Sequence, residues 1–424
     1  MVLHRPVECT ALIGTCIIGS EYNAELMATN VLGWTKSRQR YLLTAALAAV
    51  LVLVMPFAAR GQNQHAPKPA AGEPLPEPAI PAILAAFDKY EVVAMPEAHG
   101  LKDLDDFILT LIRTPAPTEK VNDIEVECGN SLYQPVLDRY IAGEDVPFKD
   151  VRKVWRNTTQ DMCGTSIFFE EFFPIVRRVN QKLPQDKRIR VLAGDPPIDW
   201  EEVKSLKDTG KLPGRDVTAA SVLEKEVLSK HRKALMLFGT FHLLHGVGDD
   251  AVSIVETTHP GAVFVISHLG VFGSNFQTLS SSPFASWPVP SLARTKGTWL
   301  GSTDLGQFLI EPIFFQGCEF RREFPKKYQR PVAELVDAFI YLGPPNLSLN
   351  EQWPIDIVID DNYRKELTRR DLLMGIPEGS HWSHGFEQEA AGGAENPFPI
   401  LPQPDLKAMK KACLEGRNPS PGMP

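Results

Sequence analysis

The stretch Glu91-Val-Val-Ala-Met-Pro-Glu-Ala-His-Gly100 sets the fold and the chemistry of this chain. Its apolar run, Val92 to Ala94, has no polar face and predicts a strand buried on both sides, although so short a run does not by itself exclude a helix. The turn after it carries Glu97 and His99, and the amphipathic segment 101–113 predicts a helix. Glu97 and His99 would then lie at the carboxyl end of the strand, where open α/β sheets bind ligands.

A carboxylate and an imidazole two residues apart can share a proton or a metal ion. In the alternative interpretation, Glu97 caps the following helix and His99 is an ordinary turn residue. These ten residues alone do not decide between the two, because short motifs recur by chance.

Five further apolar runs predict strands, and helical patterns lie between most of them. The expected strands cover residues 123–127, 189–193, 234–238, 262–267 and 338–342, and the expected helices cover 80–90, 131–141, 148–157 and 167–183. A further helix is expected to open at Trp200, with Asp199 as its cap. The alternation predicts an α/β fold with a largely parallel central sheet and helices on both faces.

Several of these strands end in a residue that can transfer protons or bind metal. The residues are Glu127, Asp195, His242 with nearby His245, and His268. Each has a plain alternative, because a glutamate at a strand end is often a solvated charge and a lone histidine is usually buried and neutral. Their repetition along one predicted edge favours a functional site.

The composition is that of a globular protein with a large core. The chain has 424 residues, of which 43% are hydrophobic and 23% charged, and its net charge is −8. This mildly acidic balance gives no reason to expect nucleic acid as a partner.

Residues 1–61 are expected to form an export signal region. Three basic residues precede the apolar run 42–55, and Ala59-Arg60-Gly61 offers small residues for cleavage. The run is short for a membrane span, so a cleaved signal is favoured over an anchor. The mature protein would be periplasmic or extracellular, and membrane contact would arise only through an uncleaved signal.

The remaining chain divides into three parts. Residues 62–79 predict a proline-rich linker, 80–375 the α/β domain, and 376–424 a flexible tail. Within the domain, the weakly periodic segment 270–331 predicts a lid-like insertion over the strand edge.

The six cysteines show no metal-binding spacing. Cys9 and Cys16 belong to the signal region, and the other four are widely spaced. An exported protein could pair these four, and the sequence does not say which. Cys128, which follows a predicted strand, is expected to be a small buried residue.

The strand-end residues resemble a superfamily that joins erythromycin esterases, ChaN-type haem-binding proteins, and the TraB and Tiki proteins. Those families share a first strand ending in Gly-Glu-x-His or Gly-x-x-His, a second strand ending in Glu, and a late Gly-x-x-His. Here the motifs are Pro96-Glu97-Ala98-His99, Glu127 and Gly239-Thr240-Phe241-His242, within Val92 to Gly343. Pro96 replaces the usual glycine, and the Glu-x-His spacing is closest to ChaN.

The branches of this superfamily imply different chemistries. The esterase-like branch implies activation of water, with His99 as the base, Glu127 holding its imidazole and His242 polarising the carbonyl or the oxyanion. The Tiki branch implies a divalent metal on the same residue types, for which the candidates are Glu97, His99, Glu127 and His242. The ChaN branch implies haem or iron binding without turnover.

The sequence thus favours an exported hydrolase that acts on an ester or amide, with or without a metal ion. The alternatives are a non-catalytic haem- or iron-binding protein and a partner-binding role on a decayed site. No Gly-x-Ser-x-Gly elbow and no phosphate loop occur, which disfavours serine hydrolases and nucleotide hydrolysis. A small molecule is the expected partner, and the candidates for binding it are Asp195, His245, His268 and Trp287.

Overall fold

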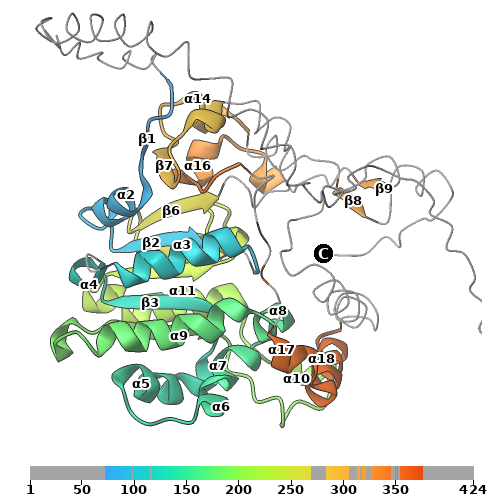
Figure 1. Cartoon of the computed structure of the whole chain (residues 1–424). Helices are drawn as coiled ribbons and strands as arrows, with labels where there is room; N and C mark the ends of the chain where they lie inside the picture. The colour runs from blue at the N-terminus through green and yellow to red at the C-terminus, as the bar shows by residue number, and fades with distance from the viewer. Residues whose placement is uncertain are drawn as a thin grey trace, which may run out of the picture. The chain divides into compact units, whose positions relative to one another are not determined.

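A central eight-stranded sheet, in the order β1-β7-β10-β6-β2-β5-β3-β4, organises the computed structural model (Figure 1). The structure describes residues 72–97, 99–114, 117–268, 283–304, 313–315, 318–320, 326–344, 349, 351 and 354–375. The strands of the sheet are β1 (Pro76–Pro78), β2 (Val92–Pro96), β3 (Asp123–Asn130), β4 (Arg190–Asp195), β5 (Ala234–Phe238), β6 (Val263–His268), β7 (Ser291–Arg294) and β10 (Ala338–Tyr341).

The sheet is parallel from β10 to β4, and only its other end is antiparallel. Strand β7 runs antiparallel to both β10 and β1, whereas the remaining neighbours pair in parallel. The predicted α/β fold with a largely parallel sheet is therefore confirmed. It follows from strands such as β2, in which Val92 and Ala94 pack into one core while Val93 and Met95 pack into the other.

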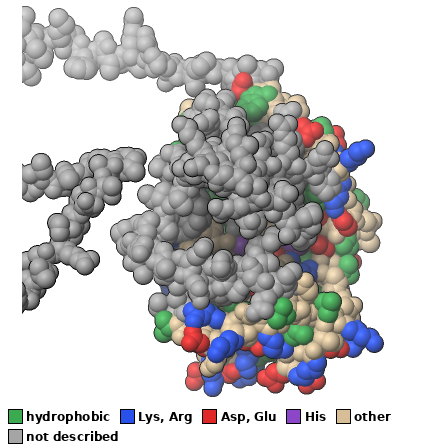
Figure 2. All heavy atoms as spheres, turned by 90° about the vertical axis from the view of Figure 1, so that its right-hand side faces the viewer, with side chains coloured by type: hydrophobic (Ala, Val, Ile, Leu, Met, Phe, Trp, Pro, Cys, Tyr) green, Lys and Arg blue, Asp and Glu red, His purple; other side chains and the backbone are tan. Residues whose placement is uncertain are grey.

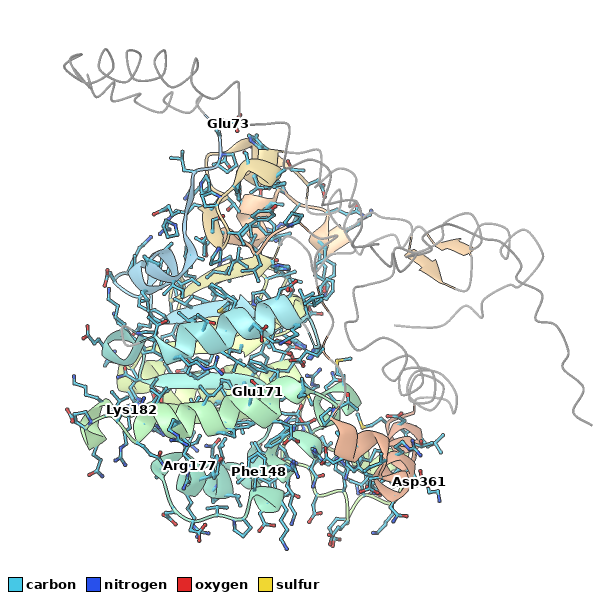
Figure 3. All side chains as sticks on the ribbon, in the orientation of Figure 1. Glu73, Phe148, Glu171, Arg177, Lys182 and Asp361 are labelled. Atoms are coloured by element: carbon cyan, nitrogen blue, oxygen red, sulfur yellow. A yellow bond between two sulfur atoms is a disulfide. The ribbon has the colours of Figure 1, made fainter. Side chains whose placement is uncertain are left out.

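The first face of the sheet is covered by α2 (Ala79–Ala86), α3 (Lys102–Arg113), α5 (Gln134–Ala142) and α9 (Ile167–Asn180). Four phenylalanines of α9 are buried there. The charged residue Glu171 lies on the exposed side of the same helix (Figure 3). An aromatic stripe on one side and charges on the other fix how α9 packs.

The second face is covered by α11 (Arg215–Glu226), α12 (Ala251–Glu256), α14 (Trp299–Ser302) and α16 (Val332–Leu335). Helix α11 connects β4 to β5. Both strands pair in parallel with β3, so they run in the same direction. A crossover helix begins at the edge where its preceding strand ends. The first residues of α11 therefore lie beside the carboxyl ends of the strands.

Seven further α-helices lie in the described part of the chain. They are α4 (Pro117–Lys120), α6 (Phe148–Val151), α7 (Lys153–Arg156), α8 (Asp161–Gly164), α10 (Leu206–Thr209), α17 (Ile355–Val358) and α18 (Asp361–Met374). A separate two-stranded sheet joins β8 (Ile313–Phe315) to β9 (Cys318–Phe320). No helix among the described ranges is long and apolar enough to cross a membrane.

Three local expectations need correction. The linker expected at 62–79 ends in strand β1, which pairs with β7 (Pro76 opposite Ala293) and, as an edge strand, tolerates proline. The described residues of the 270–331 insertion include β7 itself, which extends the main sheet. No helix opens at Trp200; the Asp199 carboxylate instead accepts a hydrogen bond from the Glu201 amide in a turn. The export region 1–61 and the tail 376–424 lie outside the described residues.

Candidate active site

The carboxyl ends of four adjacent strands, β2, β5, β3 and β4, carry the candidate residues. Glu97 and His99 follow β2, Glu127 lies in β3, Asp195 ends β4, and His242 follows β5. The structure brings these five residues into one connected cluster, as the sequence predicted from their repetition along one edge.

Glu97 holds both the backbone and the ring of His99. The His99 amide donates to Glu97 Oε1 over 2.9 Å, and His99 Nδ1 lies 2.8 Å from Glu97 Oε2. The Nδ1–Oε2 distance is that of an ion pair, and buried Oε2 has no other partner among the described residues. His99 has a φ of 45°, the left-handed region that non-glycine residues seldom adopt outside functional turns.

Glu127 forms the centre of the cluster. Its Oε1 lies 3.7 Å from His99 Nε2 and 3.4 Å from His242 Nε2. The Arg215 guanidinium pairs with the same oxygen, and the Gly239 amide donates to Oε2. A carboxylate that is 2% exposed thus faces two imidazoles and a guanidinium.

His242 is anchored on its far side by Asp216. His242 lies in a short 3-10 helix after β5, and its Nδ1 is 2.7 Å from Asp216 Oδ1. The same oxygen accepts a hydrogen bond from the Ala251 amide, which fixes the carboxylate. Asp216, His242, Glu127, His99 and Glu97 therefore form a chain in which carboxylates and imidazoles alternate.

Asp195 joins the cluster through Arg215. Its carboxylate accepts hydrogen bonds from the Thr159 amide at 2.6 Å and the Thr159 hydroxyl at 2.7 Å. The Arg215 Nε lies 3.2 Å from Asp195 Oδ1. Asp195 thus positions the guanidinium that holds Glu127, and its link to a substrate remains a prediction.

The charges within the cluster support one another. Burial lowers the pKa of His99, but Glu97 and Glu127 more than offset it and raise the pKa to about 9. Burial acts against His242 in the same way, and Asp216 and Glu127 raise its pKa to about 9. Burial raises the pKa of Glu127, yet Arg215 and the two imidazoles hold it well below the usual range. At neutral pH the cluster therefore consists of charged groups in close pairs.

Sequence reasoning missed Arg215 and Asp216. Both lie in the first turn of α11, which the sequence analysis did not identify as a helix. The available signal is the stretch Gly214-Arg215-Asp216, which lies between the apolar strands β4 and β5. A crossover helix between two parallel strands must start at the edge that carries the site.

The other candidates have different surroundings. His245 Nδ1 lies at hydrogen-bond distance from Glu256, and its Nε2 from Asp337. His268 is buried at the end of β6, the strand that pairs with β2, and burial lowers its pKa to about 4. Trp287 packs against Phe284 and Tyr341 in the second core. None of these contacts of His245 and Trp287 reaches Glu127.

Cys128 is paired, contrary to the expectation of a free buried residue. It forms a disulfide with Cys163 of α8, 35 residues further along the chain. One ligand atom each from Glu97, His99 and Cys128 lies within 4.8 Å of the others. The disulfide therefore lies directly beside the Glu97–His99 pair, and while it is closed Cys128 offers no thiolate to a metal.

Gly239 leaves a space where the cluster meets. A Cβ at this position would lie 3.2 Å from Glu127 Oε2, 3.6 Å from His99 Nε2 and 3.6 Å from His242 Cδ2. Figure 2 views the side of the molecule that is at the right in Figure 1, and histidine side chains are visible there. The space beside Gly239 is therefore no larger than about one methyl group, and Glu127, His99 and His242 bound it.

Comparison with known proteins adds little. No model of a protein family matches the chain, and no curated protein matches it. A solved structure of a protein from Bacillus cereus has a TM-score of 0.39 and 10% sequence identity, and the match covers 64% of this chain and 95% of that one. A likeness this slight carries no functional inference.

Proposed function

We propose that the protein is an exported hydrolase that attacks an ester or amide of a small molecule at the Glu/His cluster. The observation that carries the proposal is the alternating chain of three carboxylates and two imidazoles around the space beside Gly239. Such an arrangement brings proton donors and acceptors together around one point, as general acid–base catalysis requires.

His99 acts as the general base in this proposal. Its Nδ1 faces Glu97 and its Nε2 faces the centre of the cluster. Glu97, and not Glu127 as the sequence suggested, is the residue that orients the imidazole. The neutral form of His99, whose share grows as the pH rises toward its pKa of about 9, takes a proton from water through Nε2, and the charge that forms on the ring is stabilised by the two carboxylates.

His242 acts as the electrophilic partner. Asp216 holds its ring through Nδ1 and keeps it charged near neutral pH. Its Nε2 would donate to the carbonyl oxygen of the substrate and to the oxyanion that follows. Arg215 fixes Glu127 between the two rings and so keeps both histidines in position.

A divalent metal fits one half of the cluster poorly. The Arg215 guanidinium pairs with the Glu127 oxygen that faces both imidazoles, so a metal ion there would meet a fixed positive charge. Haem also fits less well, because His242 has a carboxylate beside each ring nitrogen and would have to exchange one for iron. These contacts favour metal-independent hydrolysis over haem binding.

The disulfide supports an exported location. Disulfides persist mainly in oxidising compartments outside the cytoplasm. The Cys128–Cys163 bond therefore agrees with the proposed signal sequence in residues 1–61.

Chromogenic esters and anilides of small acids test the proposal. The purified protein should hydrolyse at least one of them, and His99→Ala should lower kcat/KM by about 10²–10⁴. Added imidazole should partly restore the rate of His99→Ala, because it can diffuse into the space left by the ring. Lys211 is exposed and pairs with Asp208, outside the chain of carboxylates, so Lys211→Ala serves as a surface control. Hydrolysis that persists unchanged in His99→Ala would contradict the proposal.

A further inference from the structure

The Cys128–Cys163 disulfide lies beside the pair formed by Glu97 and His99, in which Glu97 Oε2 accepts no hydrogen bond among the described residues. Glu97 is 1% exposed, and its Oε2 has no hydrogen-bond partner among the described residues. Cys128 and Cys163 are both fully buried. A buried carboxylate oxygen that accepts no hydrogen bond is costly, and a bound cation is one way to satisfy it.

The geometry points to a second, redox-dependent function at this place: we propose that the reduced protein binds a zinc-class divalent cation through Glu97, His99 and Cys128. The three ligand atoms already lie within 4.8 Å of one another. Ligand atoms of a tetrahedral zinc ion are about 3.5 Å apart, so small side-chain movements complete the site. Three protein ligands leave a fourth position for water.

The disulfide decides whether this site exists. Zinc binds the thiolate of cysteine, and the sulfur of a disulfide lacks that negative charge. A dithiol or phosphine reductant supplies two electrons, the S–S bond breaks, and two protons from water complete the two thiols. The metal then displaces the proton of the Cys128 thiol. Oxidation by a small disulfide such as oxidised glutathione removes the two electrons again and expels the metal.

Neighbouring charges favour a cation at this position. Asp105 is fully buried and its carboxyl oxygens have no hydrogen-bond partner among the described residues. Burial, together with the charges of Glu97 and Glu351, raises the pKa of Asp105 well above its usual range, so Asp105 is neutral and Glu97 carries the negative charge that a cation would meet. The Arg215 guanidinium pairs instead with Glu127 and Asp195, on the other side of His99.

Metal binding and disulfide formation compete for the same sulfur atom. Linkage therefore requires that zinc disfavours formation of the disulfide at equilibrium by the same factor by which oxidation weakens zinc binding. The proposal goes beyond ester hydrolysis, because metal uptake is measured directly and needs no substrate.

Two cysteine variants provide a matched test. Cys163→Ser and Cys128→Ser both open the disulfide and both leave one thiol of this pair, and the other four cysteines are the same in both; only Cys163→Ser keeps the proposed ligand. Zinc titration of the purified full chain should give one tight equivalent for Cys163→Ser, with affinity at least tenfold higher than for Cys128→Ser or the oxidised protein. Cobalt in place of zinc should show a sulfur-to-metal charge-transfer band in Cys163→Ser alone.

Equal zinc affinity of the two variants, or a cobalt complex without the sulfur band, would overturn the proposal. Circular dichroism checks that each variant is folded. If either variant does not fold, the wild-type protein reduced by a phosphine is titrated with cobalt and compared with its oxidised form. The absence of a sulfur band on reduction then contradicts the proposal. Hydrolysis of esters by the oxidised protein is assayed separately, so failure of one proposal does not affect the other.

Discussion

Two histidines three residues apart, His242 and His245, lie in two centres that look alike and differ in one respect. Each has a carboxylate near both ring nitrogens, and each has its pKa raised to about 9 against the effect of burial. His245 Nδ1 lies 3.0 Å from Glu256 Oε1, and its Nε2 lies 2.9 Å from Asp337 Oδ2. The Val265 amide also donates to that Asp337 oxygen.

The difference is the space that remains for a further group. Both nitrogens of His245 have a partner at hydrogen-bond distance, so nothing more can bind without breaking a contact. His242 Nε2 is 3.4 Å from Glu127, beside the space at Gly239. We call a histidine centre closed when both ring nitrogens are occupied by partners, and open when a space adjoins one of them. A closed centre stabilises the fold as an ion cluster, whereas the histidine of an open centre is a candidate catalytic group.

The largest expected effect separates the two centres by activity. His242→Ala removes the proposed oxyanion donor and should lower kcat/KM by about 10²–10⁴. His245→Ala, measured at a temperature where it is folded, should stay within about threefold of wild type, because His245 contacts none of the reacting groups. Added imidazole should not rescue His242→Ala, since a diffusing base cannot replace a fixed donor. Equal losses in the two variants would erase the functional distinction between the centres.

The next effect concerns stability and pH. The folded pKa of His245, about 9, lies above its ordinary value of 6.5, because Asp337 and Glu256 outweigh the effect of burial. The folded state therefore keeps the proton longer, so the stabilisation is fully present below about pH 6.5 and is lost as the pH rises through 9. A shift of this size corresponds to roughly 3 kcal/mol. Urea unfolding at pH 6, 7.5 and 9 should show this loss in wild type and a smaller loss in His245→Gln.

The difference between wild type and His245→Gln isolates this residue. His99 and His242 also have raised pKa values and contribute a slope of the same sign to both proteins. That shared slope cancels in the comparison. Parallel stability curves for the two proteins would show that the Glu256–His245–Asp337 cluster contributes nothing measurable.

The sequence predicted the strand ends well because the signal there is local. A buried apolar run followed by Glu or His marks Glu97, His99, Glu127 and His242 without knowledge of any distant contact. The same pattern also marks His245, and the sequence does not show that its two carboxylates come from α12 and the residue before β10. Whether a histidine centre is closed or open depends on contacts across the fold.

Other features were missed for the same physical reason. The Cys128–Cys163 pairing depends on where the short helix α8 lies against β3, which no local pattern fixes. Strands β1 and β7 are three and four residues long and lie at the edge of the sheet, so periodicity gives almost no signal. Glu125 has the strand period of Glu127, yet it is buried without a hydrogen-bond partner among the described residues, and burial raises its pKa well above the usual range. Only the packing distinguishes these two glutamates.

The smallest expected effect tests the space itself. Gly239 has a φ of −57°, which alanine adopts without strain. In Gly239→Ala the added Cβ would lie 3.2 Å from Glu127 Oε2, tighter than ordinary contact, and would fill part of the space between the imidazoles. We expect kcat/KM to fall on the order of tenfold, mainly through KM, because the variant displaces the substrate and leaves every ionisable group in place.

Gly210→Ala is the matched control: its φ is −64°, and its Cβ would meet nothing closer than the Leu206 carbonyl oxygen at 3.6 Å. Both variants should remain as stable as wild type to within about 1 kcal/mol. A Gly239→Ala protein with unchanged KM would mean that the substrate does not enter the space beside Gly239, and His242 would then be as closed a centre as His245.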